Sequence, residues 1–111
     1  MPRPPSPFVE HLLDLLSPFG EVSARRMFGG YGIYRDGLMF GLVADDEFYL
    51  KVDEGTKPVF DEAGLEPFRF EMKSGKVGTM SYHKAPESAL NWPMAMKKWA
   101  QLGWEAAQRN A

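Results

Sequence analysis

The 111-residue sequence contains no cysteine, which excludes disulfide scaffolds, thiolate metal sites and cysteine nucleophiles. It has no apolar run near the roughly 20 residues that a membrane-spanning helix needs, and its first residues lack the apolar segment of a secretory signal. Basic residues are not in excess, because 13 Lys and Arg stand against 15 Asp and Glu, with a pI near 5.7. A stand-alone DNA-binding domain usually has a pI above about 9. We therefore expect a cytoplasmic protein that does not enter a membrane.

The sequence does contain enough apolar material for one hydrophobic core. Apolar residues make up 44% of the chain and aromatic residues 14%, while charged residues make up 25%. Domains most often contain about 100–150 residues, and this composition is not that of a disordered chain. We expect a single domain over 1–111, with the proline-rich residues 1–6 as a flexible lead-in.

The spacing of apolar residues predicts eight secondary-structure elements. A repeat of three to four residues indicates helices near both ends, the first of them after a Ser-Pro helix start. Alternating apolar and polar residues between Asp-Gly, Asp-Asp and Ser-Gly turns indicate strands. The expected elements are a helix over 7–19, a long strand over 23–35 broken or bent at Gly29-Gly30, strands over 38–44 and 48–53, a short helix over 57–63 capped by Thr56, strands over 68–73 and 76–82, and a last helix capped by Asn91.

This order, α-β-β-β-α-β-β-α, predicts an α+β fold with two layers. Short turns between the strands favour a mostly antiparallel, five-stranded sheet with helices over one face. In the last helix, Trp92 and Trp99 fall on the apolar stripe, and we expect them in the core. Trp104 falls off that stripe, so we expect it on the surface.

No catalytic or cofactor-binding motif stands out. Ser81 lies in a strand pattern and lacks the G-x-S-x-G elbow of serine hydrolases. The glycine cluster at 29–32 leads into more strand rather than into the helix N-terminus that a phosphate loop requires. His11 and His83 are the only histidines and belong to different elements. We expect no enzyme activity, no cofactor and no metal.

Basic and aromatic residues are the candidates for binding a protein partner. Large aromatic side chains often dominate protein interfaces, and charge complementarity guides the choice of partner. Arg25 and Arg26 are neighbours in a strand, so they point to opposite faces of the sheet. The candidate binding residues are Arg25, Arg26, Tyr31, Tyr34, Lys51 and Trp104.

Two alternatives to protein binding stay open. The first is weak, direct binding of nucleic acid, because several basic residues fall near the last helix. These residues are Lys84, Lys97, Lys98 and Arg109. The second is a small-ligand site that uses Tyr82, His83 and a nearby carboxylate.

One string gives a specific resemblance. Residues 24–34, which read ARRMFGGYGIY, resemble the TfoX (Sxy) N-terminal domain family. The likeness continues at 36–40, 49–53 and 80–82, and it covers about 8–107. The family positions that this sequence matches are Arg25, Arg26, Met27, Phe28, Gly29, Gly30, Tyr31, Gly32, Lys51 and Tyr82, and none of them is known as catalytic.

The resemblance implies a bacterial regulator of competence (DNA transformation) genes with a fold like that of type III secretion chaperones. It also implies a protein partner in the transcription machinery, such as the cyclic-AMP receptor protein. Full-length members carry a second, C-terminal domain that this sequence does not contain, and His83 stands where many members have an aromatic residue. Our hypothesis is a non-enzymatic adaptor that works through protein contacts, with self-association into a homodimer as a further expectation.

Overall fold

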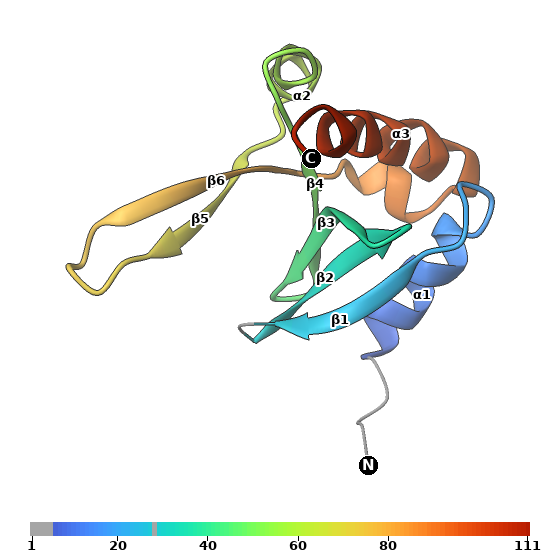
Figure 1. The fold of residues 1–111 in the computed structure, drawn as a ribbon, viewed down its shortest axis with the longest axis horizontal. Helices are drawn as coiled ribbons and strands as arrows, with labels where there is room; N and C mark the ends of the chain where they lie inside the picture. The colour runs from blue at the N-terminus through green and yellow to red at the C-terminus, as the bar shows by residue number, and fades with distance from the viewer. Residues whose placement is uncertain (1–5, 28) are drawn as a thin grey trace.

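The computed structural model describes residues 6–27 and 29–111, which form an antiparallel sheet of six strands with helices packed on one face (Figure 1). The strand order is β1-β2-β3-β4-β6-β5, and each neighbouring pair is antiparallel. The elements are α1 (Pro7–Leu16), β1 (Ser23–Met27), β2 (Gly30–Arg35), β3 (Leu38–Ala44), β4 (Glu47–Lys51), α2 (Lys57–Glu62), β5 (Pro67–Glu71), β6 (Val77–Lys84), the 3₁₀ helix η1 (Glu87–Leu90) and α3 (Pro93–Arg109).

The segment over 23–35 does break near the predicted Gly29-Gly30, but its prediction as one strand is wrong, because its two halves form separate strands. β1 and β2 pair with each other in antiparallel register, with Met27 opposite Gly30. Gly29, next to this pair, has a φ of 79°, in the left-handed region that glycine tolerates. A positive φ is compatible with a bulge and equally with a reversal of the chain. The sheet therefore has six strands rather than five, and four of them precede α2.

The start of α1 follows the prediction. Ser6 is the N-cap, its hydroxyl accepts a hydrogen bond from the Val9 N–H at 3.3 Å, and Pro7 is the first helical residue. Residues 1–5 of the expected lead-in, and Phe28 of the family motif, lie outside the described residues.

The two predicted tight turns between β2, β3 and β4 are confirmed. Asp36 and Gly37 have φ values of 51° and 77°, and Asp45 and Asp46 have values of 50° and 56°. Two successive residues with positive φ are typical of type I′ turns, whose twist matches that of the flanking strands. These turns set the antiparallel register that brings the core side chains of three consecutive strands together.

The hydrophobic core lies between the sheet and the helices. Phe40, Phe48 and Leu50 from the sheet and Leu12 from α1 are fully buried in one cluster. Gly103 lets α3 lie close to the sheet, because a Cβ there would be 2.9 Å from Leu50 Cδ2. Of the helices in the described residues, none is long and apolar enough to cross a bilayer.

The last helix begins differently from the prediction. Trp92, not Asn91, is the N-cap of α3, and the short helix η1 precedes it. Trp92 is 67% exposed, so its expected place in the core is wrong. Trp99 packs against the core as predicted, with its ring 5.1 Å from that of Phe60. Trp104, expected on the surface, is buried.

Candidate functional site

The face of the sheet opposite the core carries a continuous set of aromatic, methionine and basic side chains. A Cβ on Gly32 would lie 2.9 Å from Met27 Sδ, 2.9 Å from Tyr34 Cε1 and 3.2 Å from Met39 Sδ, so these three side chains converge over that glycine. We call this surface the open face and define it as Arg25, Met27, Tyr34, Met39, Lys51 and Tyr82, which come from β1, β2, β3, β4 and β6.

Two cations of the open face lie over aromatic rings. The Arg25 guanidinium carbon is 5.5 Å from the centre of the Tyr34 ring, and Lys51 Nζ is 5.3 Å from the centre of the Tyr82 ring. Burial raises the pKa of Tyr82, and the charged form of Tyr34 raises it further. Cation–π contacts of this kind hold a positive charge in place. The open face therefore offers fixed cations beside apolar surface, a combination suited to binding another protein.

Arg26 and Tyr31 lie on the other side of the sheet. They are direct cross-strand partners, with the Arg26 guanidinium carbon 5.4 Å from the centre of the Tyr31 ring. Tyr31 packs against the hydrophobic core. The prediction that Arg25 and Arg26 point to opposite faces is confirmed, and the candidate binding residues are therefore divided between two surfaces.

Trp104 is a structural residue, and its partner Arg35 was missed by the sequence analysis. The Trp104 ring meets the Phe40 ring edge-on at 5.9 Å. The Arg35 guanidinium carbon lies 4.6 Å from the centre of the Phe19 ring and 4.9 Å from that of Trp104. The only local signal was the place of Arg35 beside a turn, which gives no indication of aromatic contacts so distant in sequence.

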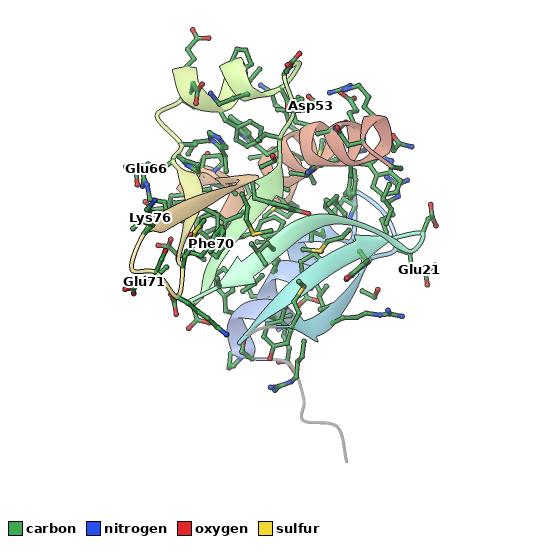
Figure 2. The ribbon with its side chains drawn as sticks, turned by 60° about the vertical axis from the view of Figure 1, so that its left-hand side comes forward. Glu21, Asp53, Glu66, Phe70, Glu71 and Lys76 are labelled. Carbon is green, nitrogen blue, oxygen red and sulfur yellow. The ribbon has the colours of Figure 1, made fainter. Side chains whose placement is uncertain are left out.

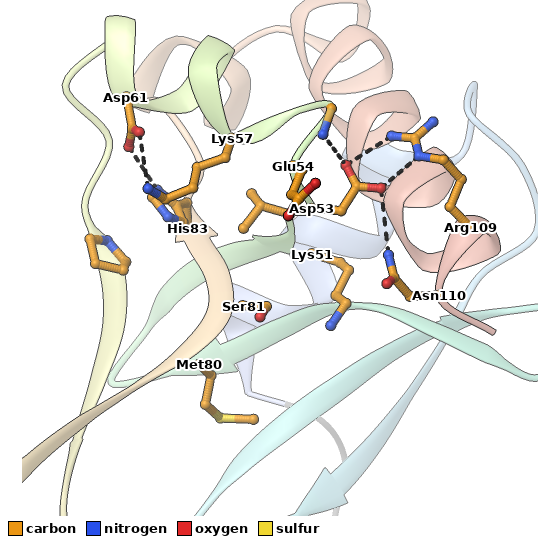
Figure 3. A pocket seen from close by; sticks show the side chains of 13 residues that line it. Lys51, Asp53, Glu54, Lys57, Asp61, Met80, Ser81, His83, Arg109 and Asn110 are labelled. Carbon is orange, nitrogen blue, oxygen red and sulfur yellow. Dashed lines mark hydrogen bonds and ion pairs between the residues drawn. The ribbon is translucent and has the colours of Figure 1, made fainter.

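An open pocket of about 1050 Å³ lies where the end of β4, β6, α2 and the end of α3 meet (Figure 3). Its lining includes Lys51, Lys57, Asp61, Ser81 and His83, so the predicted small-ligand residue His83 does border a cavity. Tyr82, the other predicted member, belongs to the open face instead. The pocket and the open face share Lys51.

The ionisable groups of the pocket are held by partners within the fold. His83 is buried, and its Nδ1–H donates a hydrogen bond to the Leu65 carbonyl at 2.8 Å. Asp61 lies 3.9 Å from that nitrogen and 3.4 Å from Lys57 Nζ. Within residues 6–27 and 29–111, no three His, Cys, Asp or Glu side chains gather as metal ligands would. The contacts of His83, Asp61 and Lys57 therefore join α2 to β6 and the segment before β5.

Asp53 ties the loop after β4 to the end of α3. Its carboxylate accepts hydrogen bonds from Arg109 Nε at 2.6 Å and Nη2 at 3.0 Å, and the Arg109 guanidinium holds the pKa of Asp53 far below its usual range. The carboxylate also accepts hydrogen bonds from the Gly55 and Thr56 N–H groups. Thr56 is the N-cap residue of α2 as predicted, but its side chain makes no capping hydrogen bond, because its hydroxyl donates to Asp53 Oδ1 instead.

The basic surface expected near the last helix is half neutralised. Arg109 pairs with Asp53, and Lys84 Nζ lies 2.9 Å from a Glu47 carboxylate oxygen. This contact lowers the pKa of Glu47 and raises that of Lys84, so both stay charged at neutral pH. Lys97 and Lys98 are exposed on α3. Two of the four basic residues expected to form this surface are therefore paired with carboxylates.

The fold and the open face define a class: a small two-layer α+β domain whose sheet is covered on one face and available for contacts on the other. The family model of the TfoX N-terminal domain matches residues 14–107, and the chain belongs to this family. It is 30% identical over 96 residues to the DNA transformation protein TfoX1 of Aliivibrio fischeri (strain ATCC 700601 / ES114). That match covers 86% of this chain and 46% of the relative, so the chain spans about half the relative's length.

Proposed function

We propose that the protein is a non-enzymatic regulator of competence genes that acts through protein contacts made by the open face. The competence-related role is supported by its family and by its similarity to a DNA transformation protein. The contact mechanism is supported by one observation above all: Arg25 and Lys51 are fixed over Tyr34 and Tyr82 on a sheet face that the core helices leave uncovered. The transcription machinery, with the cyclic-AMP receptor protein as the first candidate, is the proposed partner.

The proposal assigns separate roles to the two kinds of side chain on the open face. Arg25 and Lys51 provide charge complementarity, which mainly governs the association rate and the choice of partner. Met27, Met39 and Tyr34 provide the apolar contact area, because thioethers and aromatic rings adapt to a partner surface. The net charge of −2 makes a protein partner a better match than nucleic acid.

The experiment compares charge reversals on two surfaces of the same molecule. Arg25→Glu, on the open face, should reduce binding to purified cyclic-AMP receptor protein by at least about 10-fold, which is about 1.4 kcal/mol. The same substitution in the chromosome should lower competence-gene transcripts in the source cell. Lys98→Glu, on exposed α3, changes the net charge by the same amount and should leave both readouts unchanged.

Two results would contradict the proposal. Arg25→Glu could leave both binding and transcript levels at the wild-type values, which would exclude the open face as the contact surface. Alternatively, the wild-type chain could bind competence-promoter DNA directly, with an affinity that falls steeply with salt. That result would favour the nucleic-acid alternative and assign the basic residues to phosphates.

A further inference from the structure

The sheet has two free edges, β1 and β5, and the second one belongs to an arm formed by β5 and β6. The arm projects from the body of the domain (Figure 1). Its side chains include Phe70 (38% exposed), Met72 (44%) and Val77 (64%). In Figure 2, Phe70, Glu71 and Lys76 lie together on the arm, far from Asp53. An exposed strand edge with apolar side chains is a template for pairing with another strand.

The pairing of β5 with β6 is irregular between Pro67 and Arg69, and the side chains from Phe68 to Met72 alternate between the two faces. The Phe68 and Phe70 rings stack with centres 6.5 Å apart, and a Cβ on Gly78 of β6 would touch both Phe70 and Met72. Phe68, Phe70 and Met72 therefore share one face of the arm, and Arg69 and Glu71 share the other, as strand geometry requires. Any partner strand must keep this separation of apolar and charged faces.

The backbone groups of Arg69 and Glu71 point toward the free edge. The Met72 N–H donates to the Lys76 carbonyl at 2.8 Å, so Met72 bonds inward, toward β6. Phe70, two residues earlier and paired with Gly78, has the same orientation. In an antiparallel ladder, alternate residues bond to opposite neighbours. Arg69 and Glu71 therefore present their N–H and C=O groups to whatever lies beyond β5.

We propose that β5 pairs with β5 of a second copy of this chain, in antiparallel register about a two-fold axis at Phe70. In this register Arg69 lies opposite Glu71 of the second copy, and Glu71 lies opposite its Arg69. Each of these opposed pairs can form two backbone hydrogen bonds and one ion pair between the side chains. Phe70 lies opposite its own copy, in the closely spaced position that favours contact between aromatic rings.

The neighbouring registers are worse for a simple electrostatic reason. A two-fold axis normal to the sheet must pass through a residue of β5 to keep like faces together. Moving the axis to Arg69 opposes two arginines, and moving it to Glu71 opposes two glutamates. Like charges directly opposite each other destabilise a strand pair. Within one chain Arg69 forms an ion pair with exposed Glu66 at 3.5 Å, a surface contact whose loss costs little free energy.

The other edge lacks this self-complementarity. The middle residue of β1 is Arg25, so pairing β1 with its own copy over the full strand opposes two Arg25 side chains. Positive charge is a common device that protects an edge strand from pairing. Only β5 is therefore suited to pairing with its own copy. This pairing does not depend on the proposed contacts of the open face.

Charge-reversal variants test the register. The wild-type chain, followed by sedimentation equilibrium from low micromolar to submillimolar concentration, should associate reversibly into dimers. Arg69→Glu and Glu71→Arg should each weaken the dimer by at least about 10-fold, because each opposes like charges. Mixing the two variants should restore dimers, since every opposed pair is then complementary. Lys98→Glu, on α3, is the matched charge control and should dimerise like the wild type.

Cross-linking provides a second measurement in a chain that has no cysteine of its own. Opposed residues in a closely spaced antiparallel pair have Cα atoms about 4.5 Å apart, within the range of a disulfide. Phe70→Cys should therefore form a cross-linked dimer under mild oxidation, much faster than the exposed control Val77→Cys on β6. A wild-type chain that stays monomeric over the whole range, or dimers equally stable in all charge variants, would overturn the proposal.

Discussion

Gly30 and Gly32 belong to the same strand, but their α-carbons have very different surroundings. A Cβ on Gly30 would lie 2.1 Å from the Val43 carbonyl oxygen, which is backbone of the neighbouring strand. On Gly32, a Cβ would meet only side-chain atoms of Met27, Tyr34 and Met39. Side chains can shift to relieve such a contact, whereas the β2–β3 backbone pairing cannot shift without losing hydrogen bonds.

Alanine at these two positions should therefore affect stability unequally. We expect Gly30→Ala to lower the free energy of unfolding by about 2–4 kcal/mol, and Gly32→Ala to lower it by about 1 kcal/mol or less. Urea unfolding at neutral pH measures both values. Equal losses in the two variants would show that the β2–β3 backbone approach at Gly30 is not the constraint we describe.

The Asp53–Arg109 contact predicts a pH-dependent contribution to stability. Arg109 lowers the pKa of Asp53 in the folded state below the unfolded value of about 3.9. A carboxylate with a lowered pKa stabilises the fold above its unfolded pKa, and this stabilisation is lost as pH falls toward the folded value. Asp53→Asn should therefore be less stable than the wild type near pH 7, with the difference shrinking below about pH 4.

Urea unfolding at a series of pH values gives this difference directly. Asp46→Asn is the matched control, because Asp46 is an exposed turn residue and asparagine also tolerates its positive φ. The control should follow the wild type at every pH. A difference between wild type and Asp53→Asn that stays constant down to about pH 2 would contradict an electrostatic role for Asp53.

At the scale of secondary-structure elements, local chemistry explains what could be predicted. The turn at Asp36-Gly37 was predictable because two successive positive φ values select Asp-Gly by local sterics alone. The 23–35 segment was not, because glycines at 29 and 30 satisfy both a bent strand and a tight reversal. Choosing between them requires the pairing of β1 with β2, which depends on the rest of the sheet.

The candidate site shows the same division between local and long-range information. Strand alternation alone placed Arg25 and Arg26 on opposite faces. Nothing local linked Asp53 to Arg109, which lie 56 positions apart in the sequence. Trp104 was misplaced because the apolar stripe drawn on α3 was too narrow. Packing of α3 across the sheet buries a wider surface, which includes Trp104.

The β5–β6 arm should be the least stable element of the sheet. A two-stranded hairpin is marginally stable in water, and most of β5 and the outer part of β6 are exposed. By hydrogen–deuterium exchange at low protein concentration, the amide of Phe70 should exchange at least about 100-fold faster than that of Leu50 in β4. Equal protection of the two amides would mean that the arm opens only when the whole domain unfolds.

For the whole molecule, a single core implies a single unfolding transition. The buried cluster joins side chains of α1, the sheet, α2 and α3, so no helix can leave without exposing that core. Tryptophan fluorescence, which reports on buried Trp104, should therefore change together with far-UV circular dichroism during urea unfolding. Separate transitions would mean that one side of the domain folds on its own.

Two phenylalanine substitutions test whether stability resides in the body of the domain or in the arm. Phe40 is fully buried and contacts the rings of Phe19 and Trp104, so Phe40→Ala should lower the free energy of unfolding by about 3–5 kcal/mol. Phe70 is partly exposed on the arm. At dilutions where the chain is monomeric, Phe70→Ala should lower the free energy of unfolding by about 1 kcal/mol or less. The free energy of unfolding of a typical domain is only about 5–15 kcal/mol in total. The first substitution therefore removes a large share of the stability and the second leaves the body intact. If Phe70→Ala destabilised the monomer as much as Phe40→Ala does, the arm would belong to the cooperative core, and its free edge could not be treated as a separate binding element.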